Sequence, residues 1–155
     1  MAYIDSDYVD EIIGAPLRQA IFTDEGVYNA AAFSRAVARA TARVRGALEG
    51  AGYTPPTDAE LTSMLAGSDA QVGDAENIRA ATLGMLMMFR RKQWGTNDVG
   101  LREELYLVKK IETGELAFST LALDEGAAVG GAEFSENDPE TVTGIDPIFS
   151  RTMGR

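Results

Sequence analysis

Cysteine and histidine are both absent from this chain of 155 residues. The lack of cysteine excludes a disulfide framework, a thiolate nucleophile and a cysteine-ligated zinc site. The lack of histidine removes the commonest general base and the commonest metal ligand. Only carboxylate, lysine, serine or tyrosine chemistry, or an oxygen-ligated Mg²⁺ or Ca²⁺ site, is left. We therefore predict that the protein is not an enzyme and binds no cofactor.

Long apolar runs are lacking as well. The longest, residues 80–89, has about half the length that a membrane-spanning helix requires, so we expect no membrane partner. A secretory signal begins with basic residues, whereas the first 14 residues here carry four acids and no base, which favours assembly in the cytoplasm. The composition, 45% hydrophobic and 25% charged, is typical of one compact globular domain.

Basic residues are missing from one long part of the chain. Residues 111–150 contain nine acids and no lysine or arginine, whereas the rest has 14 basic residues against 15 acids. The acidic stretch is also rich in glycine and proline and poor in apolar residues from residue 115 onward. We therefore predict a helical body at residues 1–114 and an extended acidic C-terminal arm at residues 115–155.

Apolar residues recur at helical spacing through most of the predicted body. Asp5 or Ser6 can cap the first helix, Thr57 and Glu60 have the spacing of a capping box, and Asp74 can cap the central helix. The fold class we predict is all-α, a small bundle of about five helices. The predicted helical segments are 5–14, 16–22, 29–48, 57–65, 74–92 and 97–112, with a turn at 23–26 and a short extended segment at 116–123.

Arginines form the clearest surface pattern. Arg35, Arg39 and Arg43 are spaced four residues apart and therefore share one face of the long helix, where they can meet phosphate or an acidic protein surface, or simply be solvated. A second basic group, residues 90–92, precedes Trp94. It can be interpreted as a nucleic-acid patch, but positive charge also suits the last turns of a helix, and a buried indole explains the tryptophan.

Several segments together resemble a known family. These are Ala2-Tyr-Ile-Asp-Ser-Asp7 before a short acidic helix, the turn Phe22-Thr-Asp-Glu-Gly26, the long alanine-rich helix before Gly52-Tyr-Thr-Pro-Pro56, the run Leu105-Tyr-Leu-Val-Lys-Lys-Ile-Glu-Thr-Gly-Glu-Leu116, and the ending Phe149-Ser-Arg-Thr-Met-Gly154. With these segments the chain resembles the phage Mu-like neck proteins, the head-tail adaptors or connectors of tailed bacteriophages. It departs from the family in the more apolar Met85-Leu-Met-Met-Phe89 and in a longer acidic linker at residues 124–146.

The resemblance implies a structural protein of the virion neck, assembled in the host cytoplasm as a ring, expected to be a homo-dodecamer, below the portal. Such a ring joins the capsid vertex to the tail and continues the DNA channel, through which DNA passes without sequence-specific binding. Its partners would be the portal protein, a tail-terminator or stopper protein, and other copies of itself. Arg35, Arg39 and Arg43 are then expected at the inter-subunit interface. The portal-binding arm residues would be Ile145, Ile148, Phe149, Arg151 and Met153.

Two alternatives stay open. One is a small helical regulatory or nucleic-acid-binding module, in which the arginines would contact phosphates and binding would fall steeply with salt. The other is a different neck component, such as a head-completion or tail-terminator protein, which we expect to be richer in strand.

Overall fold

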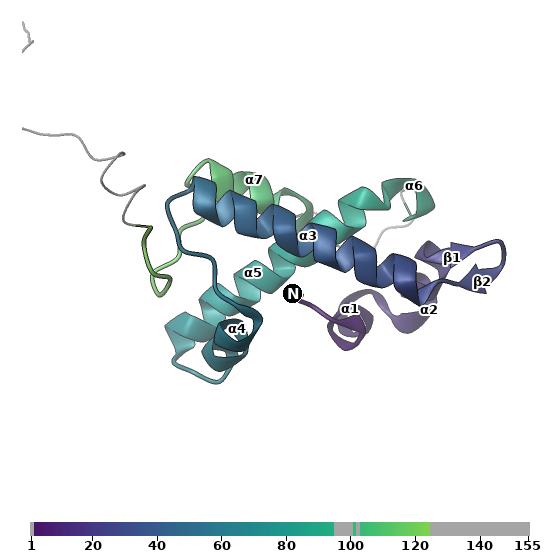
Figure 1. Cartoon of the computed structure of the whole chain (residues 1–155), viewed down its shortest axis with the longest axis horizontal. Coiled ribbons are helices and arrows are strands. Elements are labelled where there is room, and N and C mark those ends of the chain that lie inside the picture. The colour runs from purple at the N-terminus through teal and green to yellow at the C-terminus, as the bar shows by residue number, and fades with distance from the viewer. Residues whose placement is uncertain (1, 95–100, 102, 125–155) are drawn as a thin grey trace, which may run out of the picture. The chain divides into compact units, whose positions relative to one another are not determined.

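The computed structural model describes residues 2–94, 101 and 103–124. The chain divides into two units, residues 1–122 and 123–155, and every element named below belongs to the first. Figure 1 shows that this unit is built almost entirely of helices, which confirms the all-α prediction. The described residues form seven α-helices, more than the five or so predicted. None of these helices has the length and apolar character needed to cross a bilayer.

The elements follow one another in this order: α1 (Ser6–Ile13), α2 (Ala15–Ile21), β1 (Thr23–Asp24), β2 (Val27–Tyr28), α3 (Ala30–Gly50), α4 (Asp58–Leu65), α5 (Asp69–Phe89), α6 (Arg91–Trp94), the 3₁₀ helix η1 (Glu104–Tyr106) and α7 (Leu107–Glu112).

Local signals place the first four helices where the sequence predicts them. Asp5 caps α1 by accepting a hydrogen bond from the Tyr8 N–H at 2.9 Å. Asn29 caps α3 in the same way. The capping box at α4 has both of its hydrogen bonds, because Thr57 accepts from the Glu60 N–H and the Glu60 side chain accepts from the Thr57 N–H. These caps satisfy backbone donors that a helix start leaves unpaired.

The predicted turn at residues 23–26 is a small hairpin. Its strands pair antiparallel, with Thr23 opposite Tyr28 and Asp24 opposite Val27. The two loop residues, Glu25 and Gly26, have φ of 51° and 83°. Positive φ at both positions is the geometry that matches a two-residue loop to the twist of its strands.

The core lies between the two long helices, α3 and α5, and extends along both. In the first half of α3, Phe33 and Val37 are buried in one cluster with Leu83 and Leu86 of α5. In its second half, buried side chains of α3 join a second cluster that includes residues of α4, α5 and α7. These residues are Val44, Ala47, Leu48, Leu61, Met64, Ala75, Ile78, Ala81, Val108 and Ile111. The apolar segment 80–89 is therefore central, as predicted.

The start of α5 differs from the prediction. Asp74 does not cap this helix, because α5 begins earlier, at Asp69. Ser68 is the cap and forms a second capping box with Gln71, whose side chain accepts from the Ser68 N–H at 2.9 Å. Asp74 is instead a buried residue of the helix interior. The prediction was wrong because Ser68 and Gln71 satisfy more of the free backbone donors than a single aspartate can.

The end of α5 also differs from the prediction. The basic residues 90–92 do not extend its last turns, because α5 ends at Phe89 and the short α6 follows. The Trp94 indole N–H donates to the Met87 carbonyl at 2.7 Å, and Trp94 is 5% exposed. The Met87 carbonyl also accepts from the Arg90 N–H at 3.2 Å, so the indole is its second donor and ties Trp94 to the end of α5. This finding bears out the interpretation of Trp94 as a buried indole.

Within the described residues 101 and 103–112, the segment predicted as one helix at 97–112 forms a shorter helical stretch that begins at residue 104. Residues 104–106 form η1 and residues 107–112 form α7, while residues 95–100 and 102 lie outside the described part. The start of η1, at Glu104, crosses α5 at Gly84. A Cβ on Gly84 would lie 1.8 Å from the carbonyl oxygen of Glu104, so the two backbones meet there without a side chain between them.

Candidate interaction surfaces

The three arginines predicted to share a face of α3 do so. We call Arg35, Arg39 and Arg43 the arginine stripe; all three are exposed. The Arg39 guanidinium lies 4.4 Å from the centre of the Phe89 ring at the end of α5. Arg43 pairs with Glu112 of α7, with 2.7 Å between its Nη2 and the carboxylate Oε2. The stripe therefore borders α5 and α7, and two of its guanidinium groups are held by contacts within the chain.

Arg45 lies outside the stripe and has a different environment. Its Nη1 donates to the Pro56 carbonyl at 2.9 Å and to the Tyr3 hydroxyl at 3.2 Å. The Tyr3 hydroxyl in turn donates to the same Pro56 carbonyl at 2.6 Å. Burial raises the pKa of Tyr3 to about 12, so this hydroxyl stays protonated at neutral pH. Arg45 thus joins the N-terminal segment to the loop that follows α3.

The basic residues beyond α5 lie over aromatic rings. The Arg90 guanidinium is 4.7 Å from the centre of the Phe22 ring, and that of Arg91 is 5.8 Å from the Trp94 ring. Arg91 and Lys92 are exposed. Stacked guanidinium groups keep their N–H edges free for a carboxylate or a phosphate. These residues extend the positive surface next to the arginine stripe, near Phe89.

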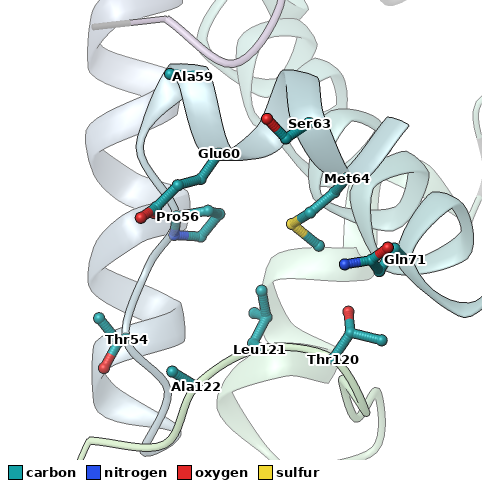
Figure 2. Close-up of a pocket in the computed structure, with 10 residues that line it drawn as sticks. All are labelled: Thr54, Pro56, Ala59, Glu60, Ser63, Met64, Gln71, Thr120, Leu121 and Ala122. Atoms are coloured by element: carbon teal, nitrogen blue, oxygen red, sulfur yellow. The ribbon is translucent and has the colours of Figure 1, made fainter. Parts of the chain in front are cut away.

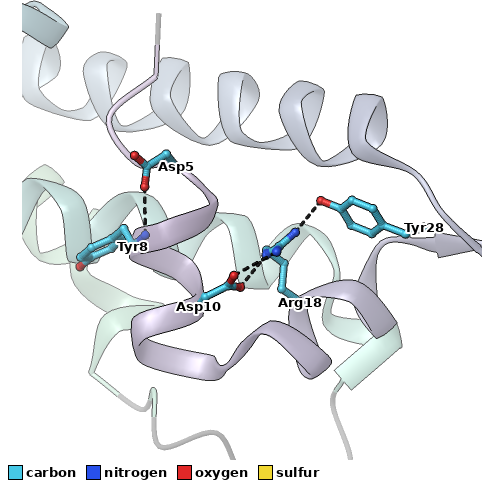
Figure 3. A network of polar contacts seen from close by, with 5 residues as sticks. All are labelled: Asp5, Tyr8, Asp10, Arg18 and Tyr28. Atoms are coloured by element: carbon cyan, nitrogen blue, oxygen red, sulfur yellow. Dashed lines mark hydrogen bonds and ion pairs between the residues drawn. The ribbon is translucent and has the colours of Figure 1, made fainter.

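A fourth arginine environment, that of Arg18, was not predicted from the sequence. Figure 3 shows Arg18 of α2 between Asp10 of α1 and Tyr28 of β2. Its Nε and Nη2 donate to the two carboxylate oxygens of Asp10 at 2.5 and 3.0 Å, and its Nη1 donates to the Tyr28 hydroxyl at 2.6 Å. Arg18 is only 8% exposed. This two-pronged ion pair fixes the angle between α1 and α2 and ties the hairpin to both helices.

The Asp10–Arg18 pair predicts a dependence of stability on acid. Hydrogen bonding to Arg18 lowers the pKa of Asp10 below its usual value, which is about 3.9 in an unfolded chain. The stabilisation is therefore complete above pH 4 and is lost as the pH falls through the lower folded-state pKa. We expect Asp10→Asn to be less stable than the wild type at pH 7, and the difference in free energy of unfolding to shrink below pH 4. Urea titrations of both proteins at pH 7, 4, 3 and 2 measure this difference in free energy of unfolding.

Glu115→Gln is the control for this experiment, because Glu115 is exposed, lies outside the helices, and forms no ion pair with another residue of the described part. Its difference from the wild type should change little over the same pH range. An Asp10→Asn difference that stays constant down to pH 2 would contradict the assigned pair.

The segment after α7 belongs to the compact unit. The first unit ends at residue 122, beyond the predicted boundary at residue 114. Phe118 is 5% exposed and lies edge-on to the Tyr53 ring, with 5.5 Å between ring centres. The Phe118 N–H donates to the Tyr53 hydroxyl at 3.2 Å, and the Thr54 N–H donates to the Ala122 carbonyl at 2.8 Å. Residues 116–122 thus pack on the loop after α3, although they form bends where an extended segment was predicted.

Asp74 secures this segment. Its Oδ2 accepts hydrogen bonds from the Thr120 N–H at 2.8 Å and from the Thr120 hydroxyl at 2.5 Å. Asp74 is 7% exposed, so both bonds form at the edge of the core. A buried aspartate in a helix interior indicates that a hydrogen-bond donor lies nearby, but the sequence does not show which residue supplies that donor.

A pocket of about 440 Å³ lies beside this contact (Figure 2). Pro56, Met64 and Leu121 give it an apolar lining, and α4, the start of α5 and the 120–122 segment form its walls. Two of its polar side chains, Glu60 and Gln71, already take part in capping boxes, and Thr120 is bonded to Asp74. Among the described residues, no group of three acidic, histidine or cysteine side chains is placed to hold a metal ion.

The predicted portal-binding residues all lie outside the described residues. They are Ile145, Ile148, Phe149, Arg151 and Met153. Their role stays a prediction, as does the place of the arginine stripe at an inter-subunit interface.

Comparisons with known proteins give no match. No family model, no curated protein and no solved structure is similar to this chain. The class that the structure defines is a small helical domain with a hairpin, and the family resemblance noted in the sequence stays a prediction.

Proposed function

We propose that this protein is a structural head-tail adaptor, or connector, of a tailed bacteriophage. In this role, copies of the chain form a ring below the portal, join the capsid vertex to the tail and continue the DNA channel. The partners are the portal protein, a tail-terminator or stopper protein, and neighbouring copies. The location is the neck of the virion.

The observation that carries this proposal is the arginine stripe. It lies on one face of α3, a helix of 21 residues whose other face is buried, so its position is rigid. Arg39 and Arg43 are held against α5 and α7, while Arg35 has no ion pair within the described part of the chain. Guanidinium groups that are exposed and already held in place, as those of Arg39 and Arg43 are, suit an acidic protein surface, because little side-chain entropy is lost on binding.

The charge of the whole chain supports the same role. The net charge is −10, and the predicted arm contributes most of the excess of acids. A duplex carries one negative charge per phosphate, so an acidic lumen repels it weakly along its whole length. DNA can then move through a ring of such subunits without being retained.

Co-sedimentation with the portal protein of the same virus tests the proposal. We expect the full chain to pellet with portals and to form rings on them in negative-stain images. A chain truncated after Gly144 should keep its helical circular dichroism but lose at least about tenfold in portal affinity, because the apolar residues at 145–153 are removed. Undiminished attachment of the truncated chain would contradict the portal-binding role of residues 145–155. Absence of attachment by either chain would contradict the adaptor role itself.

A nucleic-acid-binding module is the second candidate, and the basic residues over aromatic rings near Trp94 favour it. In that case Arg35, Arg91 and Lys92 would contact phosphates. The affinity for duplex DNA would then fall steeply between 50 and 200 mM salt, as expected when several phosphate contacts release counterions.

A further inference from the structure

Opposite charges are segregated between two helices of the compact unit. α3 carries four arginines and one acid, Glu49, which lies near its C-terminal end. α1 carries three acids and no base. One of these acids, Asp10, is paired with the buried Arg18. The other two, Asp7 and Glu11, are exposed and form no ion pair within the described part of the chain.

The two charged surfaces lie on different flanks of α3. In Figure 1, α1 is on one side of α3, and α6 and α7 are on the other. The contacts agree: Ser34 and Val37 of α3 line a pocket with the residues at the start of α1, whereas Arg39 contacts Phe89 at the end of α5. The acids of α1 therefore do not neutralise the arginines of the same copy.

The spacing of the charges also matches. Asp7 and Glu11 are four residues apart on α1, and Arg35 and Arg39 are four residues apart on α3. Residues four apart share a helix face and are separated by about 6 Å along the axis. Ile12, which is 42% exposed, follows Glu11 on α1, and Met88, which is 39% exposed, precedes the Phe89 that Arg39 contacts. Two such helices can meet through two ion pairs with an apolar contact beside them.

We propose that Asp7 and Glu11 of one copy bind Arg35 and Arg39 of the next copy, in a head-to-tail contact. This inference rests on the proposed function, and it identifies α1 of a neighbouring copy as the surface that binds the arginine stripe. Because the two surfaces differ, the contact is heterologous, and repeated contacts of this kind close into a ring when the rotation between copies permits. Carboxylates are favoured over nucleic-acid phosphates here, because the chain's net charge of −10 repels a duplex at long range.

Paired charge reversals test the contact. Variant R35E/R39E makes both surfaces acidic, and variant D7R/E11R makes both surfaces basic. Each variant alone juxtaposes like charges at every contact, so we expect its self-association to weaken by about tenfold or more relative to the wild type. An equimolar mixture restores opposite charges at every contact and should associate as the wild type does. Sedimentation velocity at 50 and 300 mM salt measures the self-association of each variant and of the mixture, both without portals and with portals present.

Matched controls separate charge pairing from a folding defect. Glu49→Arg changes an exposed charge on α3 outside the contact and should associate like the wild type. The chain has no cysteine, so Glu11→Cys and Arg35→Cys copies can be mixed and treated with a bis-maleimide cross-linker about as long as a glutamate–arginine ion pair, a span too large for a direct disulfide. A cross-linked dimer of the two single-cysteine copies is expected, and α1 keeps its other acids in this experiment.

Each result decides the inference. The contact is overturned if either charge-reversed variant alone associates as strongly as the wild type, or if the mixture does not restore association. If rings still form on portals in that case, the adaptor role stands. Rescue in the mixture without any portal attachment supports the contact and contradicts the adaptor role. Salt-sensitive binding of the wild type to duplex DNA that R35E/R39E abolishes, with no self-association, overturns the contact and assigns the arginines to phosphates.

Discussion

Replacing Gly84 by alanine is expected to destabilise the protein by about 1–3 kcal/mol, although alanine is the better helix former. The added Cβ would lie 1.8 Å from the Glu104 carbonyl oxygen and 2.5 Å from its carbonyl carbon. Both are backbone atoms and cannot rotate away as the end of a side chain can. The segment 104–106 must therefore move off α5 or the helix must shift, and either change disturbs the core around Leu83 and Leu86. Urea denaturation followed by circular dichroism measures the loss.

Gly73→Ala is the matched control. Gly73 lies in the same helix, α5, but is exposed, and its added Cβ would meet nothing within 4 Å. Here only helix propensity changes, so we expect a gain in the free energy of unfolding of up to about 1 kcal/mol. The two glycine-to-alanine changes thus have opposite predicted signs. A Gly84→Ala protein as stable as the Gly73→Ala protein would show that the backbones do not meet at this crossing.

Replacing Asp74 by alanine is expected to release the 116–122 segment and to cost about 1.5–3 kcal/mol. The Thr120 N–H and hydroxyl both lose their acceptor, and hydrogen bonds to a carboxylate are worth more than those between neutral groups. We expect faster amide exchange at Phe118 and Thr120, while the exchange of the α3 and α5 amides follows only the global change in stability. Hydrogen exchange read by mass spectrometry measures both.

A double-mutant cycle with Thr120→Val separates the hydroxyl's contribution. Thr120→Val keeps the backbone N–H bond to Asp74 and removes only the 2.5 Å hydroxyl bond, so its cost should be a part of that of Asp74→Ala. In the Asp74→Ala background the valine should have almost no further effect. Fully additive costs in the double variant would argue against direct coupling of the two side chains.

These contacts bear on the proposed adaptor role. The Asp74–Thr120 hydrogen bonds and the Phe118–Tyr53 contact fix residues 116–122 on the body, close to the pocket next to α4. The arginine stripe and α1, which we propose to meet between copies, belong to the same compact unit.

Local sequence patterns are sufficient to predict the helical class of this protein and most of its helix starts. Caps act over three or four residues, so Asp5, and Thr57 with Glu60, could be recognised without any knowledge of the fold. The arginine stripe was predictable for the same reason, since residues four apart share a face of any α-helix. The predicted cap at Asp74 failed within this local range, because Ser68 and Gln71 form the stronger capping box.

The tertiary structure alone decided the contacts between residues distant in the sequence. Asp74 and Thr120 are 46 residues apart, and the backbones at Gly84 and Glu104 meet only because η1 crosses α5. Arg18 finds Asp10 across a turn whose angle depends on the positive φ of Gly14. No sequence periodicity predicts such pairs, since each arises from packing of the whole chain. Burial requires that a polar group has a hydrogen-bond partner, but it does not indicate which residue is that partner. The boundary at residue 122 likewise follows from the packing of Phe118 on Tyr53.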